Sequence, residues 1–81
     1  MRKEVTYVQL MSRAKSFMAQ RQYVKVKMYS TYNGFITNSY RNFDALKHDI
    51  TAQTKRGRVR VVSMESKNHV YINTDGYLGH I

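Results

Sequence analysis

The sequence predicts an α+β domain in which two helices cover one face of a small antiparallel or mixed sheet. Three observations support this prediction: two segments repeat apolar residues at helical spacing, four short segments alternate apolar and polar residues, and turn residues separate them. The expected order is helix, strand, strand, helix, strand, strand. Residues 1–81 are expected to form a single domain, because a chain of 81 residues buries only about 60–65% of its unfolded surface and so builds one modest core.

The first helix is predicted to run from about Tyr7 to Gln20. Its start is marked by Thr6 and Gln9, which are spaced as a capping box, and by Val5 and Leu10, which are spaced as a hydrophobic staple. Apolar residues at intervals of three and four form one stripe: Tyr7, Leu10, Met11, Ala14, Phe17 and Met18. We interpret this stripe as part of the core, while an anchor for the groove of a partner is the alternative interpretation.

A β-hairpin is predicted next. Between Tyr23 and Tyr32 the apolar residues alternate, as in a half-buried strand, and Phe35 to Tyr40 can return as its partner. Asn33-Gly34 tolerates the positive φ angles of a two-residue type I′ turn. That turn implies these cross-strand pairs: Tyr32 with Phe35, Thr31 with Ile36, Tyr29 with Asn38, and Lys27 with Tyr40. The outer face of the hairpin is then expected to carry Tyr23, Lys25, Lys27, Tyr29 and Tyr40.

The second helix is predicted from Phe43 to about Arg56, with Asn42 as its N-cap and Gly57 at its end. Asp44 lies near the positive end of the helix dipole, and Lys55 lies near the negative end. Its apolar stripe is narrow and consists of Phe43, Leu46 and Ile50. We therefore expect this helix to lie on the sheet with much of its surface in water.

Two further strands are predicted after Gly57. The alternation in the third strand sets Arg58, Arg60, Val62 and Met64 opposite Val59, Val61 and Ser63. The fourth strand covers His69 to Asn73, with Val70 and Ile72 opposite His69, Tyr71 and Asn73. With both helices on one side, the other side of the sheet is left in water, and the alternating positions determine its chemistry.

The charge balance indicates the class of partner. The chain has 14 Lys and Arg against 5 Asp and Glu, a formal net charge of +9. A small domain with such an excess repels itself and usually meets an anionic partner, most often nucleic acid. Disorder is the competing interpretation of a highly charged chain, but 42% hydrophobic and 12% aromatic residues with no proline favour a folded domain.

Composition also excludes several classes. Without cysteine, the chain cannot form a disulfide, a thiolate zinc site or a cysteine nucleophile. No apolar run resembles a signal peptide or approaches the roughly 20 residues that span a bilayer, and no helix combines a basic face with a Trp or Leu belt. We therefore expect a soluble, intracellular, cytoplasmic protein with no membrane partner and no cofactor.

The predicted hairpin supplies one set of candidate nucleic-acid contacts. Lys25 and Lys27 can neutralise phosphates, while Tyr29 and Tyr40 can stack on bases. Single strands would gain most from stacking, which is worth roughly 1–3 kcal/mol per base. The alternative interpretation is that the tyrosines form cross-strand pairs that only stabilise the hairpin.

The densest basic cluster supplies a second set. Lys55, Arg56, Arg58 and Arg60 fall within six residues, at the junction of the second helix and the third strand. Gly57 between them would let a phosphate backbone approach closely. The alternative interpretation is a helix end followed by a solvated edge strand that resists aggregation.

Catalytic constellations are weak in this sequence. Asp44 and Asp49 do not share a helix face, and no glycine loop for phosphate binding is present. A small nuclease in which Glu65 and His69 pair while Arg60 stabilises phosphate charge is a minor alternative. We therefore expect no enzyme.

The function favoured by the sequence is a non-catalytic nucleic-acid-binding module of low sequence specificity. The alternative is a small inhibitor or adaptor, of the kind a virus or mobile element encodes, that binds an acidic surface of a host nucleic-acid-processing protein. A homodimer, formed by pairing of the last strand with its symmetry mate, also stays open. The choices between DNA and RNA and between single and double strands stay open as well.

Overall fold

The structure, a computed structural model, describes residues 2–79. It has two helices and five strands, which are β1 (Arg2–Val5), α1 (Tyr7–Ala19), β2 (Val24–Ser30), β3 (Gly34–Tyr40), α2 (Phe43–Arg56), β4 (Val59–Ser66) and β5 (His69–Asn73). The predicted α+β class, single small domain and order of elements are confirmed, with one additional strand at the start of the chain.

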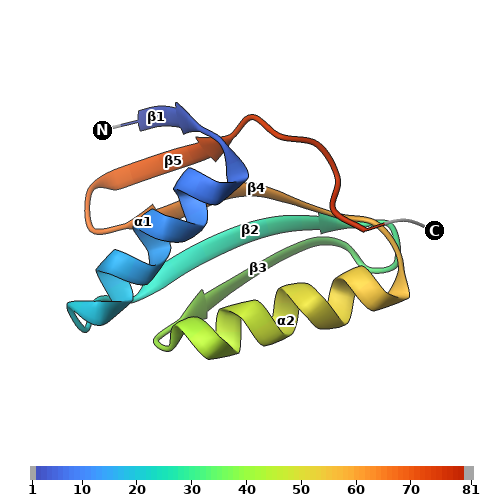
Figure 1. The fold of residues 1–81 in the computed structure, drawn as a ribbon, viewed down its shortest axis with the longest axis horizontal. Helices are drawn as coiled ribbons and strands as arrows, with labels where there is room; N and C mark the ends of the chain where they lie inside the picture. The colour runs from blue at the N-terminus through green and yellow to red at the C-terminus, as the bar shows by residue number, and fades with distance from the viewer. Residues whose placement is uncertain (1, 80–81) are drawn as a thin grey trace.

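The five strands form one mixed sheet in the order β1-β5-β4-β2-β3. β1 is parallel to β5, and every other neighbouring pair is antiparallel. Both helices lie on the same side of this sheet, and the other side is not covered by a helix (Figure 1). Because β5 lies between β1 and β4, it is an interior strand, and the expectation that the last strand has a free edge is wrong.

β1 was missed because its sequence carries almost no strand signal. Three of its four residues are exposed and charged, and only Val5 is buried. Its register against β5 places Val5 opposite Asn73, at the end of the sheet where the helix layer begins. From the sequence alone, a short, charged edge strand of this kind looks the same as a polar segment that precedes the helix.

The core lies between the sheet and the helices. β2 contributes Val24, Val26 and Met28, all without solvent exposure. The buried side chains that pack with them come from β1, α1, β3, α2 and β4: Val5, Leu10, Ala14, Met18, Tyr40, Leu46, Ile50, Val59, Val61 and Met64. The apolar stripe of the first helix is therefore part of the core, as expected.

The helix termini confirm the predicted caps. The backbone N–H of Gln9 donates to Thr6 Oγ1 at 3.2 Å, and the N–H of Thr6 donates to Gln9 Oε1 at 3.0 Å, which completes the capping box. α1 has no acid in its first turn, and Asp75 supplies one from the other end of the chain by accepting from the N–H of Tyr7 at 2.7 Å. In α2, Asn42 Oδ1 accepts from the N–H of Asp44 at 2.7 Å. Both helix starts are thus satisfied by side-chain oxygens.

The predicted register of the hairpin is wrong by three residues. Three residues, Thr31 to Asn33, connect β2 to β3, and Gly34 begins β3 with a φ of 72°. The hydroxyl of Ser30 accepts from the N–H groups of Tyr32 (3.1 Å) and Asn33 (3.4 Å), so this side chain starts the turn earlier than the Asn-Gly pair predicts. Tyr29 is consequently opposite Phe35 instead of Asn38.

An odd shift of register exchanges the two faces of β3. Tyr40, expected on the outer face, lies opposite Val24 and is only 7% exposed. Its hydroxyl donates to Asp49 Oδ2 on α2 at 2.6 Å. Burial, and next the hydrogen bond to the Asp49 carboxylate, raise the pKa of Tyr40 to about 12. The expected outward placement of Tyr40 is wrong, and this residue joins β3 to α2.

A β-bulge also changes the predicted alternation of β4. Lys27 pairs with Ser63 while Met28 pairs with Val61, so Val62 is the extra residue. After the bulge, Met64 lies on the core face with no solvent exposure, and its predicted position beside Arg58 and Arg60 is wrong.

We predict that the Tyr40–Asp49 hydrogen bond makes stability fall at high pH. Because the pKa of Tyr40 in the folded state exceeds its ordinary value of about 10, its contribution is complete below about pH 10 and is lost as the pH rises towards about 12. Tyr40→Phe removes a hydrogen bond to a charged group, so it should lower the free energy of unfolding at pH 7 by about 1.5–3 kcal/mol. The variant should also lose less stability than the parent between pH 10 and 12.

Urea unfolding at pH 7, 10 and 11.5 checks this prediction. Asp49→Asn keeps an acceptor oxygen but removes the charge, and it should give an intermediate loss at pH 7. Identical pH profiles for Tyr40→Phe and the parent would contradict the assigned role of Tyr40.

Candidate nucleic-acid interface

The open face of the sheet gathers three predicted contact residues of β2, namely Lys25, Lys27 and Tyr29. These side chains alternate with the buried Val24, Val26 and Met28, so they point away from the helices. β3 and β4 extend this face on either side of Tyr29, with Phe35 and Arg60 as its direct cross-strand partners.

Three aromatic rings meet on the open face. The rings of Tyr29 and Phe35 are 5.0 Å apart and nearly edge to face, and those of Tyr29 and Tyr77 are 6.4 Å apart in a similar arrangement. Phe35 is 68% exposed and Tyr77 is 43% exposed. We call Tyr29, Phe35 and Tyr77 the aromatic platform. Aromatic surface this accessible is costly to leave in water and is available to stack against another flat group.

Cations lie against this platform. The Nζ of Lys27 is 5.2 Å from the centre of the Phe35 ring, and the guanidinium of Arg58 is 4.5 Å from the centre of the Tyr77 ring. Cation–π contacts of this kind hold a charge in place without neutralising it, because the ring carries no net charge. The platform is therefore flanked by positive charge at both ends.

The segment after β5 positions Tyr77 and Arg60. A bridge between Val59 and Leu78, with N···O distances of 3.2 and 2.6 Å, ties this segment to the start of β4. Arg60 donates from Nε to the carbonyl of Asp75 at 3.2 Å and from Nη2 to the carbonyl of Asn73 at 3.4 Å. Both acceptors are neutral, so Arg60 is fixed in orientation and keeps its full charge.

The acids of the chain do little to neutralise this surface. Within residues 2–79, no Lys or Arg forms an ion pair with a carboxylate. Asp49 accepts from Tyr40 and Asp75 accepts from the start of α1. The register places two acids on the open face, namely Glu65, directly opposite Lys25, and Glu4 on the edge strand β1, opposite Ile72. Lys25 therefore has a carboxylate as a cross-strand neighbour, whereas Lys27 is opposite Ser63 and Thr37, and Arg60 is opposite Tyr29.

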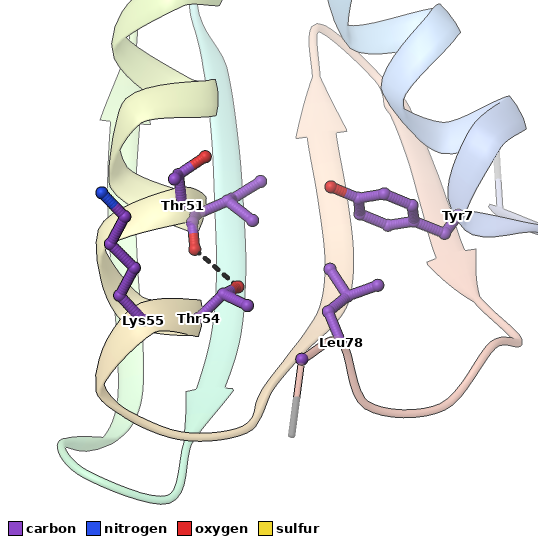
Figure 2. Close-up of a pocket in the computed structure, with 7 residues that line it drawn as sticks. Tyr7, Thr51, Thr54, Lys55 and Leu78 are labelled. Atoms are coloured by element: carbon purple, nitrogen blue, oxygen red, sulfur yellow. Dashed lines mark hydrogen bonds between the residues drawn. The ribbon is translucent and has the colours of Figure 1, made fainter. Parts of the chain in front are cut away.

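The four-cation cluster at residues 55–60 is divided by the fold. Arg58 and Arg60 belong to the open face, whereas Arg56 lies over the ring of Tyr32 in the β2–β3 turn, 5.2 Å from its centre. Lys55 lines a cleft on the helix side, between α2 and the segment that ends at Gly79 (Figure 2). The sequence thus predicts four neighbouring cations, and the structure distributes them over three places.

The cleft beside Lys55 has a volume of about 490 Å³. Figure 2 shows Tyr7 directed across it towards α2, with Leu78 below. Burial raises the pKa of the Tyr7 hydroxyl. The residues that line the cleft include neither a carboxylate nor a histidine, and its titratable side chains are those of Tyr7 and Lys55.

The minor nuclease alternative also fails on geometry. Glu65 pairs with Val70 on the open face, whereas His69 faces the helices and lies 5.8 Å from the ring of Phe17. The two side chains are on opposite sides of the sheet and cannot act on one phosphate.

Among residues 2–79, we find no group of three His, Asp or Glu side chains arranged to hold a metal ion. Neither helix in that range is long and apolar enough to cross a bilayer.

Phe35 and Tyr77 are not among the contact residues that the sequence predicts. The Asn-Gly pair predicts that Phe35 is opposite Tyr32, whereas the turn that the Ser30 hydroxyl starts places Phe35 opposite Tyr29 on the open face. Tyr77 lies in a short segment without periodicity, and its place on the platform depends on the Val59–Leu78 bridge.

No family model matches this chain, and neither the curated proteins nor the solved structures include a significant match.

Gly57 and Thr31 determine where Arg58 lies. Thr31 Oγ1 accepts from the N–H of Arg58 at 3.1 Å, and the N–H of Thr31 donates to the carbonyl of Arg58 at 3.0 Å. A Cβ atom on Gly57 would come within 2.6 Å of Thr31 Oγ1. The absence of a side chain at Gly57 therefore allows the hairpin turn to bind the residue that carries the Arg58 guanidinium.

We predict that Gly57→Ala destabilises the protein by about 1–3 kcal/mol, because the new methyl group displaces Thr31. The φ of Gly57 is extended, so alanine adds no backbone strain. In a Thr31→Ala background the same substitution should cost at least about 0.5 kcal/mol less. A double-mutant cycle from urea unfolding measures this difference, and an equal cost in both backgrounds would show that the two residues are not coupled.

Proposed function

We propose that this protein is a non-catalytic nucleic-acid-binding module that holds single-stranded nucleic acid on the open face of its sheet, with low sequence specificity. The observation that carries the proposal is the aromatic platform, which lies on an uncovered face and is flanked by Lys27, Arg58 and Arg60. Flat rings and unpaired cations on one surface match the two repeating parts of a nucleic acid, its bases and its phosphates.

Single strands are favoured because the platform offers stacking. An unpaired base can lie on an exposed ring, whereas the bases of a duplex are already stacked on one another. Each stacked base is worth roughly 1–3 kcal/mol, so one or two engaged rings outweigh the gain from a single surface charge. A face that recognises rings and phosphates tolerates any sequence, and this is the basis for low specificity.

The proposed contacts divide into two roles. Tyr29, Phe35 and Tyr77 stack on bases, and the phosphates are bound by Lys25, Lys27, Arg58 and Arg60. Lys55 and Arg56 lie apart from the platform, and they contribute to the general positive field. Tyr40 has no place in this set, because its ring is in the core.

We predict that binding is strongly salt-dependent. If about five phosphates are neutralised, the logarithm of affinity should fall against the logarithm of salt concentration with a slope near −3.5 for single strands and near −4.5 for duplex. Fluorescence anisotropy with labelled DNA and RNA oligonucleotides between 50 and 300 mM salt measures this slope. A slope near zero would contradict the proposal.

The inhibitor or adaptor interpretation would be favoured instead by a different pair of results. The protein would bind every polyanion only weakly, and the immobilised domain would capture one acidic protein in stoichiometric amount.

We predict that Phe35→Ala weakens binding to single strands by about 1–3 kcal/mol, roughly 5- to 150-fold, and changes duplex binding much less. Phe35 is the most exposed ring of the platform and is not in the core, so the fold should persist. Phe35→Tyr keeps the flat ring and should bind like the parent. Titrations of matched single- and double-stranded oligonucleotides at one salt concentration compare the variants, and equal losses on both substrates would remove stacking from the mechanism.

A further inference from the structure

A second group of unpaired cations lies on the helix side of the molecule, where the end of α1 approaches the start of α2. The Nζ atoms of Lys15 on α1 and Lys47 on α2 lie over the ring of Phe43, at 5.8 and 5.9 Å from its centre. Together with Arg41 they line a single groove between the two helices. We call this surface the helix groove.

The electrostatics of the helix groove favour an anion. Three cations line it against one acid, Asp44. Asp44 lies in the first turn of α2, where its charge interacts with the positive end of the helix dipole. No ion pair with a carboxylate is formed by Lys15, Arg41 or Lys47.

The groove and the aromatic platform use opposite sides of the sheet layer. Lys15 and Lys47 project from the helices, and both helices cover the same sheet face (Figure 1). Lys27, Tyr29 and Phe35 project from the other face. A ligand seated on one surface therefore leaves the other free.

We propose that the helix groove is a second binding site for a phosphodiester backbone, so that one protein molecule bridges two segments of nucleic acid. This inference rests on the proposed function of the open face and adds a separate site to it. The groove differs from the platform in chemistry, because its one ring, Phe43, is half-buried and is approached by a lysine from each helix, whereas Phe35 of the platform is 68% exposed. It binds phosphates alone and does not distinguish single from double strands.

Native mass spectrometry of the full chain with a six-nucleotide oligodeoxythymidine tests the inference, because it counts the oligonucleotides bound to one protein molecule. The parent should form complexes with one and with two oligonucleotides. Lys15→Gln combined with Lys47→Gln should keep the first complex and weaken the second by about tenfold or more, because two charges facing the phosphates are lost. Arg41→Gln is a second variant and should weaken the same step to a smaller extent.

The matched control removes two charges elsewhere. Lys3→Gln combined with Lys67→Asn alters residues outside both surfaces, and asparagine suits the positive φ of 54° at position 67. This variant should form both complexes. Circular dichroism verifies that each variant is folded.

Three results would overturn the inference. The parent could bind only one oligonucleotide, which would leave the open face as the binding site and remove the groove. The Lys15/Lys47 variant could form the second complex as well as the parent does, or the control could lose it equally, which would make net charge the cause. Absence of any complex would instead contradict the proposed function itself. Adding Phe35→Ala to the Lys15/Lys47 variant should weaken the one complex that this variant retains, because that complex is expected on the open face.

Discussion

The burial of Val24, Val26 and Met28 against the two helices is the constraint on which the rest of the structure depends. These side chains alternate along β2, so the intervening Lys25, Lys27 and Tyr29 point to the opposite, open face of the sheet. Because β2 pairs with both β3 and β4, its orientation also sets the faces of Phe35 and Arg60. The chemistry of the open face is thus a consequence of how the core is packed.

The molecule places its cations over rings instead of pairing them with acids. Six cation–π contacts involve Lys15, Lys27, Arg41, Lys47, Arg56 and Arg58, while no ion pair is formed within residues 2–79. Each such contact contributes about 0.5–1 kcal/mol at an exposed site. This arrangement orders the side chains and leaves their charge available, so the net charge of +9 is not compensated by ion pairs within the described residues.

The predictable parts of this fold are those encoded by local chemistry. The caps at Thr6 and Asn42 and the end of α2 at Gly57 depend on hydrogen bonds within a few residues, and the sequence pattern located all three. The register of β3 and the bulge at Val62 depend on how strands meet across the sheet, for which the chain offers only competing turn signals. The same contrast between local patterns and long-range pairing applies to the residues of the candidate site. Alternation along the strands predicts the open-face position of Lys27, Tyr29, Arg58 and Arg60. In contrast, Tyr77 lies on the platform because of the Val59–Leu78 bridge, and Tyr40 lies in the core because of the register shift of β3.

Charge and stability are linked in a domain of this size. The 13 buried apolar residues found within positions 2–79 must offset the repulsion among nine excess positive charges, and the margin that remains in small domains is a few kcal/mol. A polyanion that binds only the folded state stabilises it by mass action, in proportion to the logarithm of its concentration over its dissociation constant. The repulsion that weakens the free protein is also relieved by the ligand. Under the proposed function, the same unpaired cations that reduce the stability of the free domain would strengthen its attraction to nucleic acid, so that stability and binding are coupled through one set of charges.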